Sequence, residues 1–296
     1  MLDVEDECAR LEARLADPAV LRDFLLARCL RRSLRALEPL RETAARLRAL
    51  REDLAAAREF AAGDSAWTAE ADRLAAECRA LEGGLAAELA GRDRYDPYDA
   101  VLSIEGEERG RRAVAAFYLA LAGRHGRRMR PLDGAAGALG RDTYAVAGGG
   151  DGDPGVWADL KADNGVHLVR AQGERGEPGG HGEQGAEDLA VRVTVLPDAG
   201  TGASLPGRPE DWRIDTVCTR DPDQPPSFFI THVPTGTSCF GTGADQREAR
   251  GNALRQIAAR ALAAAVPEGE PAHRFLNPGA DPVRIHVAEA RPSGGT

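Results

Sequence analysis

The first ninety residues carry a helical pattern with few interruptions, and this pattern restricts the fold more than any other feature of the chain. Leucine and cysteine side chains recur at spacings of three, four and seven residues. They form two sets, Leu47, Leu50 and Leu54, and then Leu74, Cys78, Leu81 and Leu85. Such spacings place apolar groups on one face of a helix. The intervening positions are largely charged, often with opposite signs three or four residues apart, which supports an exposed opposite face.

Turn-forming residues divide this helical region. Clear breaks are expected at Asp17-Pro18 and at residues 63–65, with a weaker one at Gly83-Gly84. Pro39 is expected to kink or restart a helix, since it lacks a backbone N–H. Residues 1–93 are therefore predicted to form a helical hairpin or small bundle. A generic antiparallel coiled coil explains this segment equally well when it is taken alone.

The remaining sequence predicts a mixture of strands and helices. Helices are expected at residues 107–125 and from Asp245 to about residue 266. Between the last two predicted strands, Pro234-Thr235-Gly236 predicts a tight turn. The predicted strands are residues 100–104, 143–146, 166–169, 189–196, 212–217, 227–233 and 237–240. The fold class expected is α+β, with an N-terminal helical domain followed by mixed α/β core domains.

Domain boundaries follow from changes in composition. A central α/β domain is expected at residues 94–210, and a further α/β segment at 211–266. Residues 171–188 contain six glycines and no large apolar group, so a loop is expected there. Residues 267–296 contain five prolines and little pattern, which predicts a flexible C-terminal tail.

Charge and cysteine usage exclude several classes of function. The net charge is −9, so any contact with nucleic acid must come from local basic patches. The five cysteines form no Cys-x-x-Cys pair, which argues against a disulfide framework or a zinc site. No apolar run approaches the length of a membrane span, and acids occupy the N-terminus where a signal peptide needs bases. A cytoplasmic protein without cofactor, metal or membrane contact is expected.

Several strings resemble the bacterial class I peptide chain release factors, in particular their type-2 branch. The resemblance begins with the leucine-rich start around Asp17-Pro18 and continues in the same order over nearly the whole chain. The strings are residues 95–104, 114–121, 160–170, 193–197, 212–215, 230–236 and 252–254. The most specific is Ile-Thr-His-Val-Pro-Thr-Gly at residues 230–236. The resemblance implies a release-factor core and a role in translation termination, with the ribosome or tRNA as partner.

The catalytic loop of that family is not preserved. Family members hydrolyse peptidyl-tRNA with a Gly-Gly-Gln loop, in which glycine allows backbone conformations that point an N–H at the developing oxyanion. Here residues 216–229 contain no glycine and are fewer than in the family pattern. Gln224 is present, between Asp223 and Pro225, and is the weak candidate for a catalytic residue. A shortened surface turn is the favoured interpretation, and the protein is more plausibly not an enzyme.

The codon-reading element is also replaced. The type-2 branch has Ser-Pro-Phe after a Leu-Val-Arg string. The corresponding positions here follow Arg170 and Ala171 and are Gln172, Gly173 and Glu174. No serine hydroxyl or phenylalanine ring stands at these positions to read stop-codon bases. The resemblance therefore implies a scaffold without its codon-reading tripeptide.

Basic residues on the last predicted helix offer a possible RNA contact. They are Arg247, Arg250, Arg255 and Arg260. A solvated helix face explains them equally well. The histidines are scattered without ligand spacing, and the glycine-rich runs do not sit between a strand and a helix as phosphate loops do.

Three functions stay open from the sequence. The favoured one is a release-factor-like protein, associated with the ribosome, tRNA or a protein partner, that lacks hydrolysis. The second is an active peptidyl-tRNA hydrolase with an altered loop. The third is a scaffold repurposed as a protein interaction module outside translation.

Overall fold

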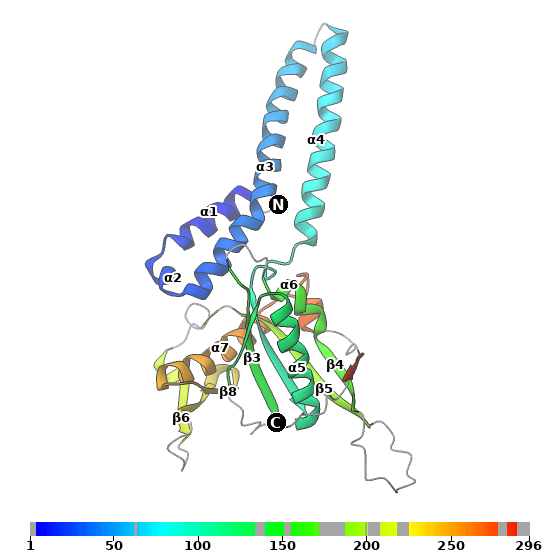
Figure 1. Cartoon of the computed structure of the whole chain (residues 1–296). Helices are drawn as coiled ribbons and strands as arrows, with labels where there is room; N and C mark the ends of the chain where they lie inside the picture. Colours follow the sequence, from blue (N-terminus) through cyan, green and yellow to red (C-terminus); the bar gives the residue numbers. More distant parts are fainter. Residues whose placement is uncertain are drawn as a thin grey trace, which may run out of the picture. The chain divides into compact units, whose positions relative to one another are not determined.

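The computed structural model describes residues 4–61, 64–133, 140–150, 155–171, 187–198, 200, 208–217, 225–277 and 283–288. The chain divides into two compact units, Met1–Arg94 and Tyr95–Thr296. The described part of the first unit is helical, and the second combines sheets with helices (Figure 1). The predicted α+β class is confirmed.

The N-terminal unit contains a long helical hairpin and two shorter helices. The helices are α1 (Val4–Leu15), α2 (Pro18–Arg22), α3 (Phe24–Phe60) and α4 (Ser65–Gly91). Aspartates begin three of them: the carboxylates of Asp17, Asp23 and Asp64 accept hydrogen bonds from backbone N–H groups two or three residues later. Such caps satisfy donors that a helix start leaves open. The predicted breaks at residues 17–18 and 63–65 therefore fall at capped helix starts.

The weaker break expected at Gly83-Gly84 is wrong, because α4 continues through both residues. Helix α3 continues through Pro39, so the helix does not restart there. Leu37 and Leu40 flank the proline and are buried against α1 and α2. Tertiary packing on both sides thus outweighs the one backbone hydrogen bond that proline removes.

The predicted apolar face lies between α3 and α4. Leu47 and Leu54 of α3 pack with Leu74 and Cys78 of α4. A second cluster, nearer the start of α3, joins that helix to α1 and α2 through residues such as Leu26 and Leu30. These two clusters account for the leucine spacing in the sequence.

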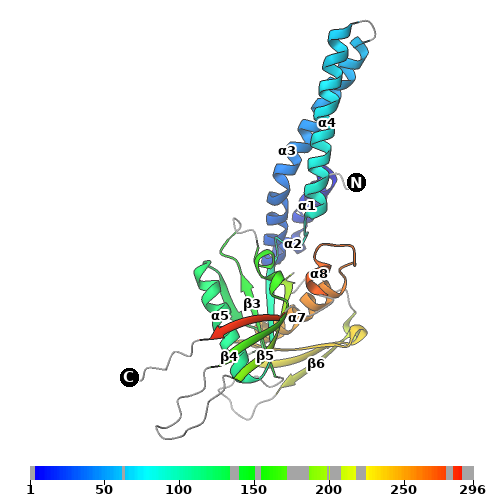
Figure 2. The same cartoon turned by 90° about the vertical axis from the view of Figure 1, so that its right-hand side faces the viewer.

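The second unit is built on a six-stranded sheet in the order β2-β3-β1-β5-β4-β9. Figure 2 labels β3, β4 and β5 of this sheet. Its strands are β1 (Asp99–Gly106), β2 (Arg128–Pro131), β3 (Arg141–Ala147), β4 (Gly165–Ala171), β5 (Glu187–Asp198) and β9 (Val283–Ala288). All neighbouring pairs are antiparallel except β4 and β9, which are parallel.

Helices cover both faces of this sheet. Helix α5 (Glu108–Arg124) packs on one face through Val114 and Tyr118, which contact a core containing Leu102 and Ile104. Helix α7 (Gln246–Ala264) packs on the other face. Neighbouring positions of β1 are therefore buried alike: Val101 and Leu102, on opposite faces, are both almost inaccessible. This two-sided burial explains the continuous apolar run in that strand.

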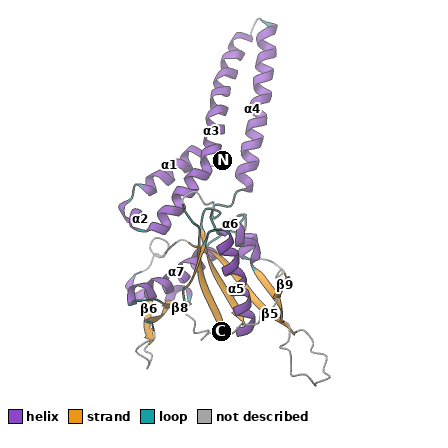
Figure 3. Cartoon of the chain, in the orientation of Figure 1, coloured by secondary structure: helices purple, strands orange, loops and turns teal. Residues whose placement is uncertain are grey.

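A three-stranded sheet lies on α7 as well. Its order is β6-β7-β8, with bounds Trp212–Val217, Ser227–His232 and Thr237–Thr242. Ile230 and Cys239 of this sheet pack against Ala253 and Ile257 of the helix. Gly241 of β8 allows the close approach, because a Cβ there would lie 2.4 Å from the Ala249 oxygen. Helix α7 is consequently shared between the two sheets (Figure 3).

Two strands and several short helices were not predicted. Residues 267–296 were expected to form a flexible tail, and they contain α8 (His273–Leu276) and strand β9. Strand β2 follows α5 directly and has a proline at its end. A helix of four residues, α6 (Trp157–Leu160), precedes β4. Short segments of this kind give weak periodic signals in the sequence. Whether they form a strand or a helix depends on the elements they pack against more than on their own residues.

Candidate functional site

The hairpin of β4 and β5 holds the segment expected to read codons. Ala171 pairs with Glu187 at the last position of the ladder, so residues 172–186 connect the two strands. Just inside that end, the Arg170 guanidinium is 3.1 Å from the Asp188 carboxylate. Gln172, Gly173 and Glu174 lie outside the described residues. The structure therefore fixes the base of this loop, and the roles of the three candidate residues remain predictions.

The hairpin of β6 and β7 holds the segment expected to contain the catalytic loop. The ladder ends at the pair Val217 and Ser227, so residues 218–226 connect the strands. The strand end is anchored, because the Ser227 hydroxyl donates to the Pro225 carbonyl at 3.1 Å and the Gly243 N–H donates to the Pro226 carbonyl at 3.3 Å. Gln224 lies outside the described residues, so its role also stays a prediction.

The predicted tight turn between β7 and β8 is confirmed. Residues Val233–Thr235 form a single 3-10 turn, and Gly236 follows in the left-handed region with φ +66°. A glycine at this position avoids the strain that a Cβ would cause. His232 fixes the turn from the strand side: its Nδ1 is hydrogen-bonded to Thr235 Oγ1 at 2.8 Å, and its ring lies 4.6 Å from the Trp212 ring. Residues 232–236 of the Ile-Thr-His-Val-Pro-Thr-Gly string therefore form the turn that joins β7 to β8.

The residues at the start of β4, which also belong to the release-factor resemblance, hold this strand in place. The Asn164 side chain exchanges two hydrogen bonds with the backbone of Val195, at 2.8 and 3.0 Å, and so joins the start of β4 to β5. His167 is fully buried, and its Nε2 donates to the Asp163 carbonyl at 2.8 Å. The Asp163 carboxylate in turn accepts from Tyr118 of α5 at 3.1 Å. These contacts fix the start of the β4–β5 hairpin and join it to helix α5.

The arginines of α7 differ in position. Asp245 caps the helix by accepting from the Glu248 N–H at 2.7 Å. Arg247 and Arg250, in the first turns, are exposed. Arg260 is half-buried, and its positive charge acts on the Cys239 thiol. Of the four candidate arginines, the first two are open to an approaching phosphate.

Arg255 requires a correction. Its side chain is 7% exposed and forms an ion pair with Asp198 of β5, whose side chain is 1% exposed. The Arg255 Nε is 2.7 Å from Asp198 Oδ2, and a second guanidinium nitrogen bonds the same oxygen. A phosphate could reach this guanidinium only by breaking a buried charge pair, which is costly. Arg255 therefore leaves the set of proposed RNA contacts. Asp198 could not be singled out from the sequence, since nothing local marks an acid at a strand end as the partner of a distant helix.

Two titratable groups with displaced pKa values serve packing. Burial raises the pKa of Asp133 to about 6, although its carboxylate accepts from the Thr143 N–H at 2.9 Å. Burial also raises the pKa of the Cys239 thiol, and the charge of Arg260 lowers it in part. Burial is the main cause of both shifts.

The described residues offer no group of three or more His, Cys, Asp or Glu side chains that could hold a metal ion. Among the described helices, none combines the length and the apolar character that crossing a membrane requires.

Comparisons with known proteins give a consistent result. A family model described as the PCRF domain matches residues 4–173. Peptide chain release factor 1 of Rhodococcus jostii (strain RHA1) is 34% identical over 284 residues, which cover 89% of this chain and 76% of the relative. The protein of the same name from Acidothermus cellulolyticus is 35% identical over 283 residues, covering 90% and 76% of the two chains.

Among solved structures, RF2 of Thermus thermophilus is similar with a TM-score of 0.50 and 18% sequence identity. The alignment covers 97% of this chain and 86% of that one. At this identity the likeness concerns the fold. The sequence relatives carry the name of factor 1 and the structural neighbour is RF2, so the assignment to the type-2 branch stays a prediction.

Proposed function

The chain belongs to the class I peptide chain release factor family, and we propose that it is a release-factor-like protein without peptidyl-tRNA hydrolysis or stop-codon reading. Family membership supports a role like that of a translation termination factor. Association with the ribosome or tRNA through the retained scaffold is the proposed activity. No cofactor is required for it.

The observation that carries this proposal is the connection between β6 and β7. The ladder closes at Val217 and Ser227, and the connecting residues 218–226 contain no glycine. Backbone conformations that only glycine adopts readily are therefore closed to this loop. Pro225 fixes its own φ and restricts Gln224 before it. Asp223 would add a negative charge beside a developing oxyanion, which opposes the stabilisation that acyl transfer needs.

A peptide-release assay tests the loss of hydrolysis. The full chain is added to ribosomes that carry peptidyl-tRNA with a stop codon in the decoding site. We expect release at the rate measured without any factor, and no change in the Gln224→Ala variant. Release well above that rate, abolished by Gln224→Ala, would establish the alternative of an active hydrolase with an altered loop.

Co-sedimentation with ribosomes tests the proposed association. We expect binding that weakens with salt, because exposed arginines such as Arg247 and Arg250 would contact phosphates. The double variant Arg247→Glu/Arg250→Glu should lower the affinity about tenfold or more. The logarithm of the binding constant falls linearly with the logarithm of the salt concentration. The variant should make that slope shallower by about one for each phosphate that the protein no longer neutralises.

The matched control is Arg112→Glu/Arg124→Glu, which makes the same charge change at exposed positions of α5. It should leave ribosome binding near that of the unaltered chain. No binding even at low salt would favour the third function, a protein interaction module outside translation.

A further inference from the structure

The N-terminal unit contains a groove between its two long helices. Two hollows adjoin there, one of about 410 Å³ beside the start of α1 and one of about 330 Å³ farther along the hairpin. They share Arg51 of α3 and Glu82 of α4, so they form one continuous depression. Along α3 the groove extends from Ala44 to Arg58, which corresponds to about 20 Å at the helical rise.

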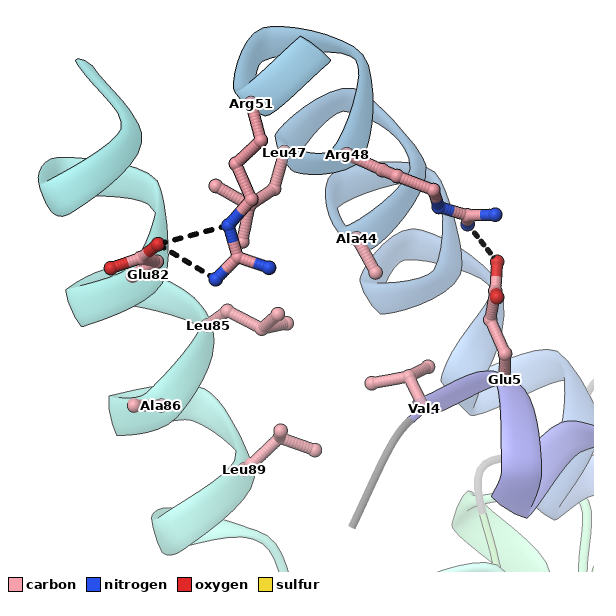
Figure 4. A pocket seen from close by; sticks show the side chains of 10 residues that line it. All are labelled: Val4, Glu5, Ala44, Leu47, Arg48, Arg51, Glu82, Leu85, Ala86 and Leu89. Atoms are coloured by element: carbon pink, nitrogen blue, oxygen red, sulfur yellow. Dashed lines mark hydrogen bonds and ion pairs between the residues drawn. The ribbon is translucent and has the colours of Figure 1, made fainter. Parts of the chain in front are cut away.

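The floor of the groove is apolar. In the first hollow, Leu47 of α3 and Leu85 and Leu89 of α4 point toward one another, and Val4 of α1 points into the same space (Figure 4). In the second hollow, Leu54 and Cys78 line the floor. Leu85 and Leu89 stand about one helical turn apart and Leu47 and Leu54 about two, so they offer rows of contacts suited to another helix.

The rim of the groove is rich in arginine. Arg48, Arg51, Arg58 and Arg79 line it, against the acids Glu5 and Glu82. Arg48 is paired with Glu5, and the Arg51 guanidinium is 2.7 Å from Glu82. Arg58 and Arg79 are exposed, and no ion pair to either occurs among the residues that the structure describes. The rim thus has an excess of positive charge in a chain whose net charge is −9.

We propose that this groove binds an acidic amphipathic helix of a partner protein. Apolar side chains at positions i, i+4, i+7 and i+11 of that helix would enter the two hollows. Glutamate or aspartate on its flanks would face the rim arginines, as in helix-in-groove recognition generally. The charge of the rim selects an acidic partner over a basic one. This inference does not rest on the proposed role in termination, because the groove lies wholly within residues 4–89.

The pair of Arg51 and Glu82 crosses the groove and does not block it. Both side chains remain well exposed, at 60% and 42%. Exposed ion pairs contribute little net stability. An acid of the bound helix can therefore replace Glu82 as the partner of Arg51 at small cost.

Binding of a synthetic peptide to the full chain tests this proposal. The probe is a labelled 18-residue helix with leucines at i, i+4, i+7, i+11 and i+14 and mostly glutamate elsewhere, and fluorescence anisotropy gives its Kd. The variant Arg58→Glu/Arg79→Glu should raise the Kd at least tenfold. The control Arg112→Glu/Arg124→Glu, with the same net charge, should leave it unchanged. A twin peptide with lysine in place of glutamate should bind at least tenfold more weakly.

Three results would overturn the proposal. The first is no binding of the glutamate peptide up to 1 mM. The second is equal binding to both double variants, since the peptide would then recognise net charge or another surface. The third concerns a second copy of the chain as the occupant. If sedimentation velocity showed a dimer that Arg58→Glu/Arg79→Glu dissociates, the groove would be a self-association surface.

Discussion

Replacing Arg255 by methionine is expected to lower the free energy of unfolding by about 3–5 kcal/mol. The substitution removes one partner of the ion pair between α7 and β5 and leaves the Asp198 carboxylate buried. Methionine fills a similar volume, so little of the loss should come from a cavity. Urea denaturation of the two proteins, followed by far-UV circular dichroism, measures the difference.

The expected size follows from the surroundings of Asp198. Its Oδ2 accepts from two nitrogens of Arg255, and its Oδ1 accepts from the Gly200 N–H at 3.0 Å. A backbone N–H cannot compensate a buried carboxylate as a guanidinium does. Loss of the guanidinium therefore weakens the contact between α7 and β5.

Two variants separate this explanation from a general sensitivity of α7. The double variant Asp198→Asn/Arg255→Met removes both charges and should recover a large part of the lost stability. Arg247→Met changes an exposed arginine of the same helix and should alter stability by less than about 0.5 kcal/mol. A loss below about 1 kcal/mol for Arg255→Met alone would contradict the importance assigned to the pair.

Replacing Gly241 by alanine is expected to destabilise the protein by about 1–3 kcal/mol. A Cβ at this position would lie 2.4 Å from both the Ala249 oxygen and the Ala253 nitrogen. Both atoms belong to the backbone of α7, so no side-chain rotation can relieve the clash. The small sheet would have to move away from the helix, which would open the core around Ile230 and Cys239.

Gly251 supplies a matched control on the same helix. A Cβ there meets nothing within 4 Å. Gly251→Ala should therefore stabilise the protein by about 0.5–1 kcal/mol, since alanine favours the helix. Thermal unfolding of both variants should show midpoints shifted in opposite directions. Equal shifts would mean that the close approach of β8 to α7 is not a determinant of stability.

Much of the fold could be predicted because its signals are local. The leucine spacing of α3 and α4, the aspartates at helix starts and the Pro-Thr-Gly turn each depend on residues near in sequence. Strands β2 and β9 could not be predicted, because each is short and owes its existence to a partner strand distant in sequence.

The environment of the α7 arginines shows a second limit. At 100° per residue, Arg255 lies about 80° around the helix from Arg247 and about 140° from Arg250. The spacing itself therefore spreads these arginines around the axis. That one of them must be buried follows only from the two sheets that cover α7 on different sides. The sequence shows how the arginines are distributed around the helix. It does not show which sides of the helix the two sheets cover.

The parallel pairing of β9 with β4 has a consequence for synthesis of the chain. Residues 165–171 can form their ladder with residues 187–193 early, but their other neighbour is residues 283–288. While the nascent chain is still being extended, that side of β4 presents unpaired N–H and C=O groups. Open strand edges of this kind invite intermolecular pairing. Strand β4 is therefore expected to be open to intermolecular pairing until residues 283–288 have left the exit tunnel.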